Sequence, residues 1–375
     1  MGDTITGILK SVGKAQFALR TAERSYRAGH LDVMVQPDLT RRFALIEGAG
    51  VSGQLDPKKG RRRLASIESI GGMRPEDFGK RPRFTDLVAV DPHERFDLGG
   101  SGQESMRIVD LIAPVGKGTR QLIVSPPKAG KTVLLEQMVQ AIRQCSPKSR
   151  IIVLLIDERP EEVTHFRRAT DGAEIVASTS DHGTDEHVEL AELMLAHVQT
   201  ELECGREVVL LIDSLTRIGR VFNSRTRGRG APRGHTMSGG LEAGILEVPR
   251  RLFGLARNIE NGGSVTIIAT CLINTGSRMD QLIFEEFKGT GNSELVLDRT
   301  LAEARIFPAI DIPASGTRKE AKLYSQDHIH GIATLRRVLS SYEPRGAMES
   351  LFKLLKKYPD NAGFLESMSS QGNRV

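Results

Sequence analysis

The stretch Ser125-Pro126-Pro127-Lys128-Ala129-Gly130-Lys131-Thr132 decides the fold of this chain. It follows the apolar run Leu122 to Val124 and opens a segment with apolar residues at helical spacing. A loop between a strand and a helix N-terminus directs backbone N–H groups at phosphate, and the helix dipole adds positive potential. We therefore expect Lys131 to neutralise the β- and γ-phosphates of ATP and Thr132 to ligate Mg²⁺. Ser125 stands where this motif usually has glycine, but its context favours a phosphate-binding loop over an ordinary turn.

Two further apolar runs end in acidic residues. Val208 to Ile212 is followed by Asp213, and Ile151 to Ile156 is followed by Asp157-Glu158-Arg159. The carboxyl ends of parallel strands meet at one edge of a sheet, so Asp213 is expected to join the Mg²⁺ shell. A carboxylate after the second run can polarise the attacking water, and Arg159 can balance phosphate charge. One such run is a weak signal, whereas two downstream of a phosphate-binding loop form a constellation.

The order of elements predicts two domains in the 375 residues. From about residue 106, strand-like runs alternate with helical segments, which indicates an α/β fold with a parallel, doubly wound sheet. Its expected strands are Leu122–Val124, Ile151–Ile156, Glu174–Ala177, Val208–Ile212 and Val265–Thr270. Residues 1–75 contain five short alternating runs and are expected to form a small all-β barrel. Residues 76–105 are rich in Gly, Pro and Arg, which is typical of a linker between that barrel and residues 106–375.

Positive charge is concentrated in two places. Residues 1–64 contain twelve Lys and Arg against six Asp and Glu, a surplus of +6 in a chain whose net charge is +5. A polyanion partner and a solvated basic face both explain that surplus. The stretch Arg217 to His235 holds six arginines and no acid, and it is glycine-rich. We expect a mobile loop that grips a phosphate backbone, the alternative being an exposed solubilising loop.

Several protein classes are excluded by the sequence. The longest apolar runs are shorter than a membrane span, and no secretory signal is recognised, so a cytoplasmic protein without a membrane partner is expected. Cys145, Cys204 and Cys271 have no metal-binding spacing. They are interpreted as buried fillers in a reducing compartment.

Several long strings closely resemble the Rho family of bacterial transcription termination factors. They are Ser125 to Thr132, Leu155 to Thr164, Thr266 to Thr270, Phe284 to Asn292, Phe307 to Asp311 and Ser315 to Glu320. The resemblance implies a RecA-like ATPase domain preceded by an RNA-binding barrel of the OB or cold-shock type. It also implies a homohexameric ring that hydrolyses ATP with Mg²⁺ at subunit interfaces. Such a ring pulls single-stranded RNA through its centre and acts on the RNA polymerase elongation complex.

The resemblance also assigns roles in the nucleotide site. Glu158 would activate water, Asp213 would be the Walker B acid, and Arg318 would be the arginine finger supplied by the neighbouring subunit. Val133 and Phe307 would flank the adenine. The implied ATP-binding residues are Gly116, Lys117, Gly118, Thr119, Arg120, Gln121, Lys128, Ala129, Gly130, Lys131, Thr132, Val133, Arg159, Arg299, Arg305 and Phe307.

On the RNA side the sequence departs from the family pattern. The implied RNA-binding residues are Phe17, Arg20, Arg41, Arg42 and Phe43 in the barrel, and Arg229, Arg233, His235 and Lys288 in the two loops that line the channel. Met34 stands where the family has Tyr, and His235 where it has Lys. With Phe17 and Phe43 as the candidate rings, the primary RNA site is impoverished, and both rings are equally compatible with a core role. Tyr26 is either a compensating ring or a turn residue.

Two other readings remain open on the sequence alone. One is a RecA-like ring ATPase that acts on protein, since a fold does not fix a substrate. The other is an RNA-binding Rho relative with weak termination activity. The basic barrel and the arginine-rich stretch favour RNA over protein, and the complete set of catalytic residues favours an active enzyme.

Overall fold

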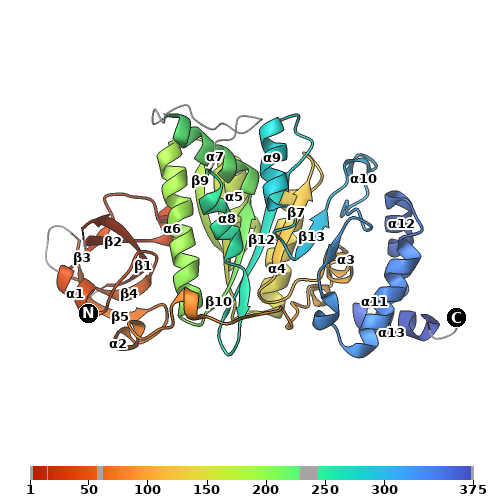
Figure 1. The fold of residues 1–375 in the computed structure, drawn as a ribbon, viewed down its shortest axis with the longest axis horizontal. Coiled ribbons are helices and arrows are strands. Elements are labelled where there is room, and N and C mark those ends of the chain that lie inside the picture. The colour runs from red at the N-terminus through yellow and green to blue at the C-terminus, as the bar shows by residue number, and fades with distance from the viewer. Residues whose placement is uncertain (1–2, 15, 57–61, 229–243, 373–375) are drawn as a thin grey trace.

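The structure is a computed structural model of the chain, and it describes residues 3–14, 16–56, 62–228 and 244–372. It contains a five-stranded sheet near the N-terminus and a nine-stranded sheet covered by helices on both faces (Figure 1). The strands are β1 Thr4–Gly13, β2 Gln16–Arg20, β3 Val33–Val35, β4 Gly50–Leu55, β5 Leu64–Ile70, β6 Ala89–Val90, β7 Arg120–Ser125, β8 Arg150–Glu158, β9 Glu174–Thr179, β10 Glu207–Asp213, β11 Arg257–Ile259, β12 Ser264–Leu272, β13 Ser293–Val296 and β14 Gly316–Thr317. The α-helices are α1 Pro37–Arg42, α2 Pro75–Phe78, α3 Glu104–Ile112, α4 Lys131–Cys145, α5 Pro160–Ala169, α6 Thr184–Glu203, α7 Leu215–Gly228, α8 Glu247–Gly254, α9 Arg278–Phe287, α10 Arg299–Glu303, α11 Gln326–Leu339, α12 Pro344–Leu355 and α13 Asn361–Gly372. Four 3-10 turns complete the description: η1 Ala22–Arg24, η2 Phe84–Asp86, η3 Gly99–Ser101 and η4 Glu320–Leu323.

The N-terminal sheet curls into a small barrel, and its five predicted strands are confirmed. The strands are antiparallel in the order β3-β2-β1-β4-β5. A bridge between Met34 and Arg63 brings the two edge strands together. The resulting neighbour order, with α1 between β3 and β4, is that of a partly open OB-type barrel. Alternate residues of the strands, among them Leu9, Leu19 and Val51, fill its core.

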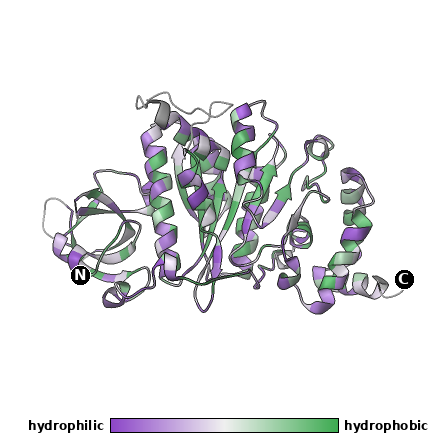
Figure 2. Ribbon diagram, viewed as in Figure 1, coloured by the Kyte–Doolittle hydropathy of each residue, from purple (hydrophilic) through white to green (hydrophobic). Residues whose placement is uncertain are grey.

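The second sheet is the predicted parallel, doubly wound sheet. Strands β13, β7, β12, β10, β8 and β9 run parallel, and β14 adds an antiparallel edge. The central strands are buried on both faces, which is why they read as continuous apolar runs (Figure 2). The five strands expected from the sequence are confirmed, while the short strands β6, β11, β13 and β14 were not predicted.

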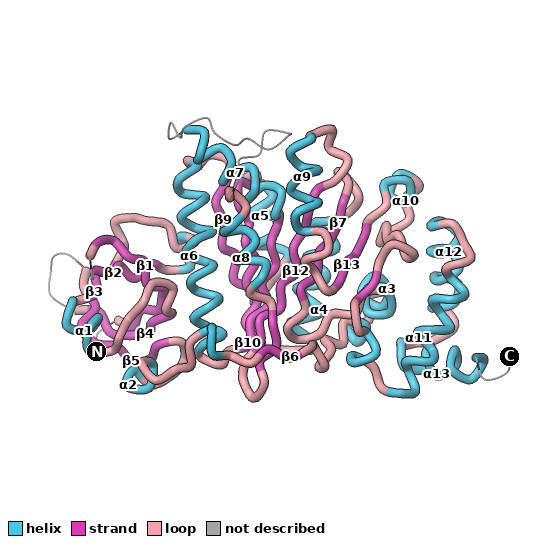
Figure 3. Tube along the Cα trace, viewed as in Figure 1, coloured by secondary structure: helices cyan, strands magenta, loops and turns pink. Residues whose placement is uncertain are grey.

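Two apolar layers hold this sheet. One face packs against α3, α4, α5 and the C-terminal helices α10 to α13. The other packs against α6, α7, α8 and α9. Figure 3 shows the strands enclosed between these helices. The stripe of Leu135, Met138, Val139 and Ile142 on α4 is buried, as its helical spacing predicted.

The barrel is joined to the large sheet by buried polar contacts as well as by residues 76–105. Ser25 Oγ accepts a hydrogen bond from the Ala177 amide of β9 at 3.0 Å, and the Tyr26 hydroxyl donates to Glu174. Gly48, at φ +85°, accepts from His197 Nδ1 of α6 at 2.7 Å. A Cβ at Gly48 would lie 2.4 Å from the Ala196 carbonyl carbon, so only glycine permits this close approach.

Residues 76–105 contain short ordered elements. Phe78 of α2 packs in the barrel core, whereas β6 pairs with β11 at the edge of the large sheet. The connecting chain therefore runs along both sheets (Figure 1). Domain limits at residues 75 and 105 remain a prediction.

Two sequence predictions are wrong in part. The stretch from Arg217 to Gly228 belongs to helix α7 and is no loop, because Ile218, Val221 and Phe222 form a buried apolar stripe between the arginines. The remainder of the predicted loop, up to His235, lies outside the described residues. Cys145 is exposed, whereas Cys271 is buried as expected and Cys204 is half-buried; all three thiols are free.

Candidate active site

The phosphate-binding loop joins β7 to α4 with a strained backbone. Lys128 and Gly130 have φ of +66° and +88°. The positive φ of Gly130 favours glycine, and a Cβ there would crowd the ring of Phe307 at 3.2 Å. Lys131 and Thr132 then begin α4, at the positive end of its dipole. The loop is therefore shaped for an anion in front of the helix, as its sequence predicted.

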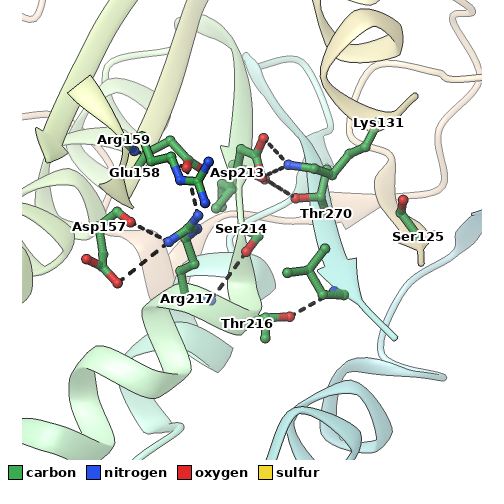
Figure 4. Close-up of polar contacts among 12 residues, drawn as sticks. Ser125, Lys131, Asp157, Glu158, Arg159, Asp213, Ser214, Thr216, Arg217 and Thr270 are labelled. Carbon is green, nitrogen blue, oxygen red and sulfur yellow. Dashed lines mark hydrogen bonds and ion pairs between the residues drawn. The ribbon is translucent and has the colours of Figure 1, made fainter. Parts of the chain in front are cut away.

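Asp213 ends β10 directly opposite the loop. The Lys131 ammonium donates to both oxygens of this carboxylate, which is 2% exposed (Figure 4). The Thr270 hydroxyl, from the neighbouring strand β12, donates to Asp213 Oδ1 at 2.9 Å. Strands β7, β10 and β12 thus bring a cation, a carboxylate and a hydroxyl to one edge of the sheet.

Glu158 ends β8 on the same edge and is 2% exposed. Its Oε1 accepts hydrogen bonds from Arg217 Nη2 at 2.8 Å and from the Arg159 amide at 3.1 Å. Burial raises the pKa of this carboxyl above its ordinary value, the Arg217 charge lowers it, and the nearby Asp213 raises it again. A carboxylate with an elevated pKa and one fixed cationic partner is suited to accept a proton from water.

Replacing Arg217 by Gln is expected to move the acid limb of the pH–rate profile for ATP hydrolysis to higher pH. Arg217 favours the ionised form of Glu158, so its loss raises that pKa further, and the active carboxylate is lost at a higher pH. A hydrogen bond to a charged group contributes about 1.5–3 kcal/mol, so kcat should fall roughly tenfold or more.

The control is Arg168→Gln on α5, an exposed arginine with the same change of charge. Steady-state hydrolysis across the pH range distinguishes the two variants. An acid limb that stays in place in the Arg217 variant contradicts this pairing.

A pocket of about 600 Å³ lies beside the loop. It is lined by Lys128, Ala129 and Gly130 of the loop, by Val133 of α4 and by Phe307. Val133 and Phe307 are 55% and 46% exposed although both are large and apolar. The two residues expected to flank adenine therefore offer apolar surface in one cavity, and an aromatic and an aliphatic group suit a flat base.

The predicted arginines lie on two opposite edges of the sheet, one formed by the carboxyl ends of the parallel strands and the other by their amino ends. Arg299 and Arg305 follow β13 on the side of the loop; both are exposed, and Arg299 pairs with Glu303 at 2.8 Å. Arg318 follows β14, where its amide donates to the Asn292 carbonyl at 2.7 Å, and Asn292 in turn bonds the backbone of Arg120. Arg120 begins β7 and the phosphate-binding loop follows the end of β7. Arg318 and the loop are thus separated by the six residues of this strand, or roughly 17–20 Å.

The segment Gly116 to Gln121 lies on the same far edge as Arg318. Lys117 pairs there with Glu94 at 2.6 Å and Glu207 at 2.8 Å. Thr119 and Gln121 are fully buried, and Gln121 Nε2 donates to Ala113 and Ser293. Within one chain these residues do not meet the loop. Arg159, by contrast, is exposed at the start of α5, beside Glu158.

The predicted RNA-binding residues of the barrel differ in exposure. Phe17 and Phe43 are 9% and 7% exposed and pack in the barrel core, so the burial favours the core role that the sequence left open. Arg20 is 6% exposed and pairs with Asp32 at 3.4 Å and Glu189 at 2.8 Å. Arg41 and Arg42 are exposed at the end of α1. Lys288 is exposed after α9, while Arg229, Arg233 and His235 lie outside the described residues.

Two residues of the site were missed by sequence reasoning. Arg217 was assigned to the RNA loop but holds Glu158, and Thr270 was noted only as part of a string. Arg217 follows Asp213 by four residues, which places it one turn into the helix after the Walker B strand. That spacing was the available signal. Nothing in the local sequence of Thr270 indicates its hydrogen bond to Asp213.

The donor set fits Mg²⁺. The buried Asp213 carboxylate and the Thr132 hydroxyl are hard oxygen ligands, and the carboxylate already faces a cation, Lys131. Asp213 lies close enough to raise the pKa of the Glu158 carboxyl, so this edge of the sheet carries two neighbouring acidic groups, which suit a divalent cation.

Comparison with known proteins agrees with this geometry. Residues 105–317 match the ATP synthase alpha/beta family, nucleotide-binding domain. The structure resembles that of a prototypical ATPase from the type III secretion system of pathogenic bacteria, with a TM-score of 0.61, 24% identity and coverage of 77% of this chain and 78% of that one. This likeness concerns the fold alone.

Similarity in sequence extends over nearly the whole chain. The transcription termination factor Rho of Aquifex aeolicus is 45% identical over 373 residues, which cover 98% of this chain and 85% of that protein. The Rho of Pseudomonas aeruginosa is 44% identical, with 96% and 87% covered. These matches cover nearly the whole chain, and the chain belongs to the Rho family of transcription termination factors.

Proposed function

We propose that this chain is an ATP-dependent RNA translocase that loads on nascent transcripts and terminates transcription by releasing RNA from RNA polymerase. The observation that carries the proposal is an OB-type barrel joined to a nucleotide-binding sheet, in a chain 45% identical to a termination factor over 98% of its length. An OB barrel is a platform for single-stranded nucleic acid. The P-loop edge, which is the edge of the sheet that carries the phosphate-binding loop (P-loop), Asp213 and Glu158, is suited to phosphoryl transfer.

The site is completed by a second copy of the chain. Arg318 lies roughly 17–20 Å from the phosphate-binding loop, so within one chain it cannot stabilise the transferring phosphoryl group. In a closed ring, the far edge of one sheet can face the P-loop edge of the next. This arrangement supports a homohexamer with Arg318 acting in trans, and it would bring Gly116–Gln121 to the same interface.

Each residue of the P-loop edge has a task in hydrolysis. Lys131 leaves Asp213 for the β- and γ-phosphates when ATP arrives, and Val133 and Phe307 hold the base. Asp213 and Thr132 would hold Mg²⁺, which supplies neutralisation of phosphate charge. Glu158, oriented by Arg217, accepts the proton of the attacking water. The positive charge of Arg318 then stabilises the transition state from the neighbouring subunit.

RNA contacts on the barrel are proposed to depend on charge. Arg41 and Arg42 are exposed, whereas both candidate stacking rings are in the core. We therefore expect weak discrimination between pyrimidines and purines and a strong dependence on salt.

Phe17→Ala is expected to lower the free energy of unfolding of the barrel by about 3 kcal/mol, because it empties a core position. Phe17→Leu, which keeps an apolar side chain, should retain stability within about 1.5 kcal/mol and bind RNA as the wild type does. Gln16→Ala, at an exposed neighbouring position, is the control. Denaturant unfolding and RNA titration give both quantities. A Leu variant that is stable but loses RNA affinity would restore the stacking role to Phe17.

The function is tested by ATP hydrolysis with and without single-stranded RNA, comparing poly-C with mixed sequence. Strong stimulation by RNA is expected. Hydrolysis indifferent to every RNA would favour a ring ATPase that acts on protein, and RNA binding without hydrolysis would favour a binding relative with weak termination activity. A transcription assay with a stalled elongation complex then measures RNA release.

The proposed setting is the bacterial cytoplasm, where nascent RNA is made. Within the described residues, none of the helices combines the length and apolar composition needed to cross a membrane.

A further inference from the structure

A basic groove of about 760 Å³ lies where the barrel, the connecting chain and two helices of the large sheet meet. Ile46 comes from the barrel, Arg81 and Arg83 from the connecting chain, Leu195 from α6 and Arg251 from α8. The groove thus lies between the proposed RNA-loading barrel, the connecting chain, α6 and α8. In Figure 1 the connecting chain crosses the foot of α6 beside the barrel.

Two of its arginines are held rigidly. Arg81 Nε pairs with Glu203 at 2.9 Å, and its guanidinium lies 3.9 Å from the centre of the Phe78 ring. Arg257 lies 4.0 Å from the centre of the Phe84 ring and donates to the Gly254 carbonyl at 3.1 Å. Its Nε is buried and has no hydrogen-bond partner among the described residues. These contacts fix cationic groups in the groove at the cost of leaving a buried donor unsatisfied.

The positive charge of the groove is not balanced from within. Glu203 is the one acidic residue among those that line it, and it already accepts from Arg81 and from the Phe84 amide at 3.1 Å. Arg83 and Arg251 are exposed, and neither has an ion pair with a described residue. Four arginines against one engaged carboxylate repel one another unless an anion enters. Ile46, 37% exposed, and Leu195 provide apolar floor beside the charges.

We propose that this groove binds the backbone of single-stranded RNA as the strand passes from the barrel toward α8, with Arg83 and Arg251 each contacting a phosphate. The inference rests on the proposed function. Guanidinium groups on exposed walls suit phosphodiesters, and apolar side chains between them accept sugars and bases without sequence preference. The resemblance assigns the arginine-rich stretch from Arg217 to His235 to a channel loop, and α8 is the next described helix after that stretch in the chain.

The test is the salt dependence of RNA binding by the full chain, using fluorescence anisotropy of labelled poly-U. The poly-U should be several times longer than the roughly 4–16 nucleotides that one OB fold covers. The test variant is the double substitution Arg83→Ala with Arg251→Ala. For single strands the slope of log K against log salt changes by about 0.7 per phosphate contact. The double variant should therefore lose about 1.4 from the slope, which corresponds to about 25-fold weaker binding at roughly 0.1 M salt.

The control is Arg168→Ala with Arg345→Ala, which removes the same two charges from exposed positions on α5 and α12. The proposal requires that this control keep the wild-type slope. As an independent reading, a photo-crosslinking residue at position 83 should label RNA, whereas one at position 345 should not.

Three results would overturn the groove. If the test variant keeps the wild-type slope, Arg83 and Arg251 make no phosphate contacts. If both double variants lose the same amount of slope, the effect comes from overall charge alone. An unchanged slope with loss of the oligomer in sedimentation would identify the groove as an interface with acidic residues of another copy. If the wild-type chain binds no RNA, the proposed function fails first, so the two failures are distinguishable.

Discussion

Glu158→Gln hydrolyses ATP at least about a hundredfold more slowly than the wild type, with RNA present, while its affinity for nucleotide is retained. A positioned general base contributes roughly 10²–10⁴ in rate, and an amide cannot accept the proton of the attacking water. The change is nearly isosteric, so the hydrogen bonds from Arg217 and from the Arg159 amide can remain. Pre-steady-state hydrolysis and a fluorescent nucleotide titration measure the two quantities.

Glu161→Gln is the matched control, since Glu161 is exposed in the first turn of α5, only three residues away. It should hydrolyse ATP as the wild type does. Full activity in the Glu158 variant would transfer the role of base to another group, Asp157 being the neighbouring carboxylate. Equal loss in both variants would indicate that the start of α5 as a whole matters.

Arg318→Ala and Lys131→Ala are each inactive alone, and mixing the two proteins restores part of the hydrolysis. An arginine finger contributes roughly 10³–10⁵ in kcat, and the P-loop lysine is needed for phosphate binding. In a mixed ring, some interfaces combine the intact Lys131 of one subunit with the intact Arg318 of its neighbour. The physical reason is the separation of the two residues along β7, which forbids their meeting in one chain.

The mixing experiment is read as hydrolysis against the ratio of the two variants at fixed total protein. A maximum near equal amounts is expected. The Lys131 variant mixed with an Arg318→Ala, Lys131→Ala double variant is the control, because no interface in that mixture has a functional P-loop. Absence of any maximum, in rings shown by mass measurement to be mixed, would exclude action in trans.

The P-loop edge was predictable because it depends on a general property of parallel sheets. Lys131, Asp213 and Glu158 each follow an apolar run, and parallel strands deliver their carboxyl ends to one edge. The adenine pair needed the family resemblance, since Val133 and Phe307 are far apart in the chain. Their shared pocket supports that assignment.

The arginines were harder to predict because their partners are remote in sequence. A count of charges from residue 217 onward found no acid nearby and indicated a free cationic loop. The structure pairs Arg217 with Glu158, 59 positions away, and Arg220 with Asp280, 60 positions away. A local count of charge cannot detect such pairs. It also takes no account of apolar residues, and it is the apolar stripe that makes this segment a helix.

Phe17 shows a different limit. Its strand was recognised by alternation, and the same alternation places Phe17 with Leu19 on the inner face. Aromatic residues in a small barrel serve either the core or a ligand, and composition does not separate the two uses. The register of β2 against β3 does separate them, because Phe17 pairs with the buried Val35.

The contacts between barrel and sheet have a mechanical consequence. Arg150, the first residue of β8, bonds both Glu174, the partner of Tyr26, and His197, the partner of Gly48. An RNA strand bound to the barrel would therefore pull on β8, the β-strand that ends in Glu158, through hydrogen bonds that are buried or half-buried. A flexible linker alone would have to be stretched before it transmitted a pull. These hydrogen bonds instead connect the barrel directly to Arg150, the first residue of the β-strand that ends in Glu158.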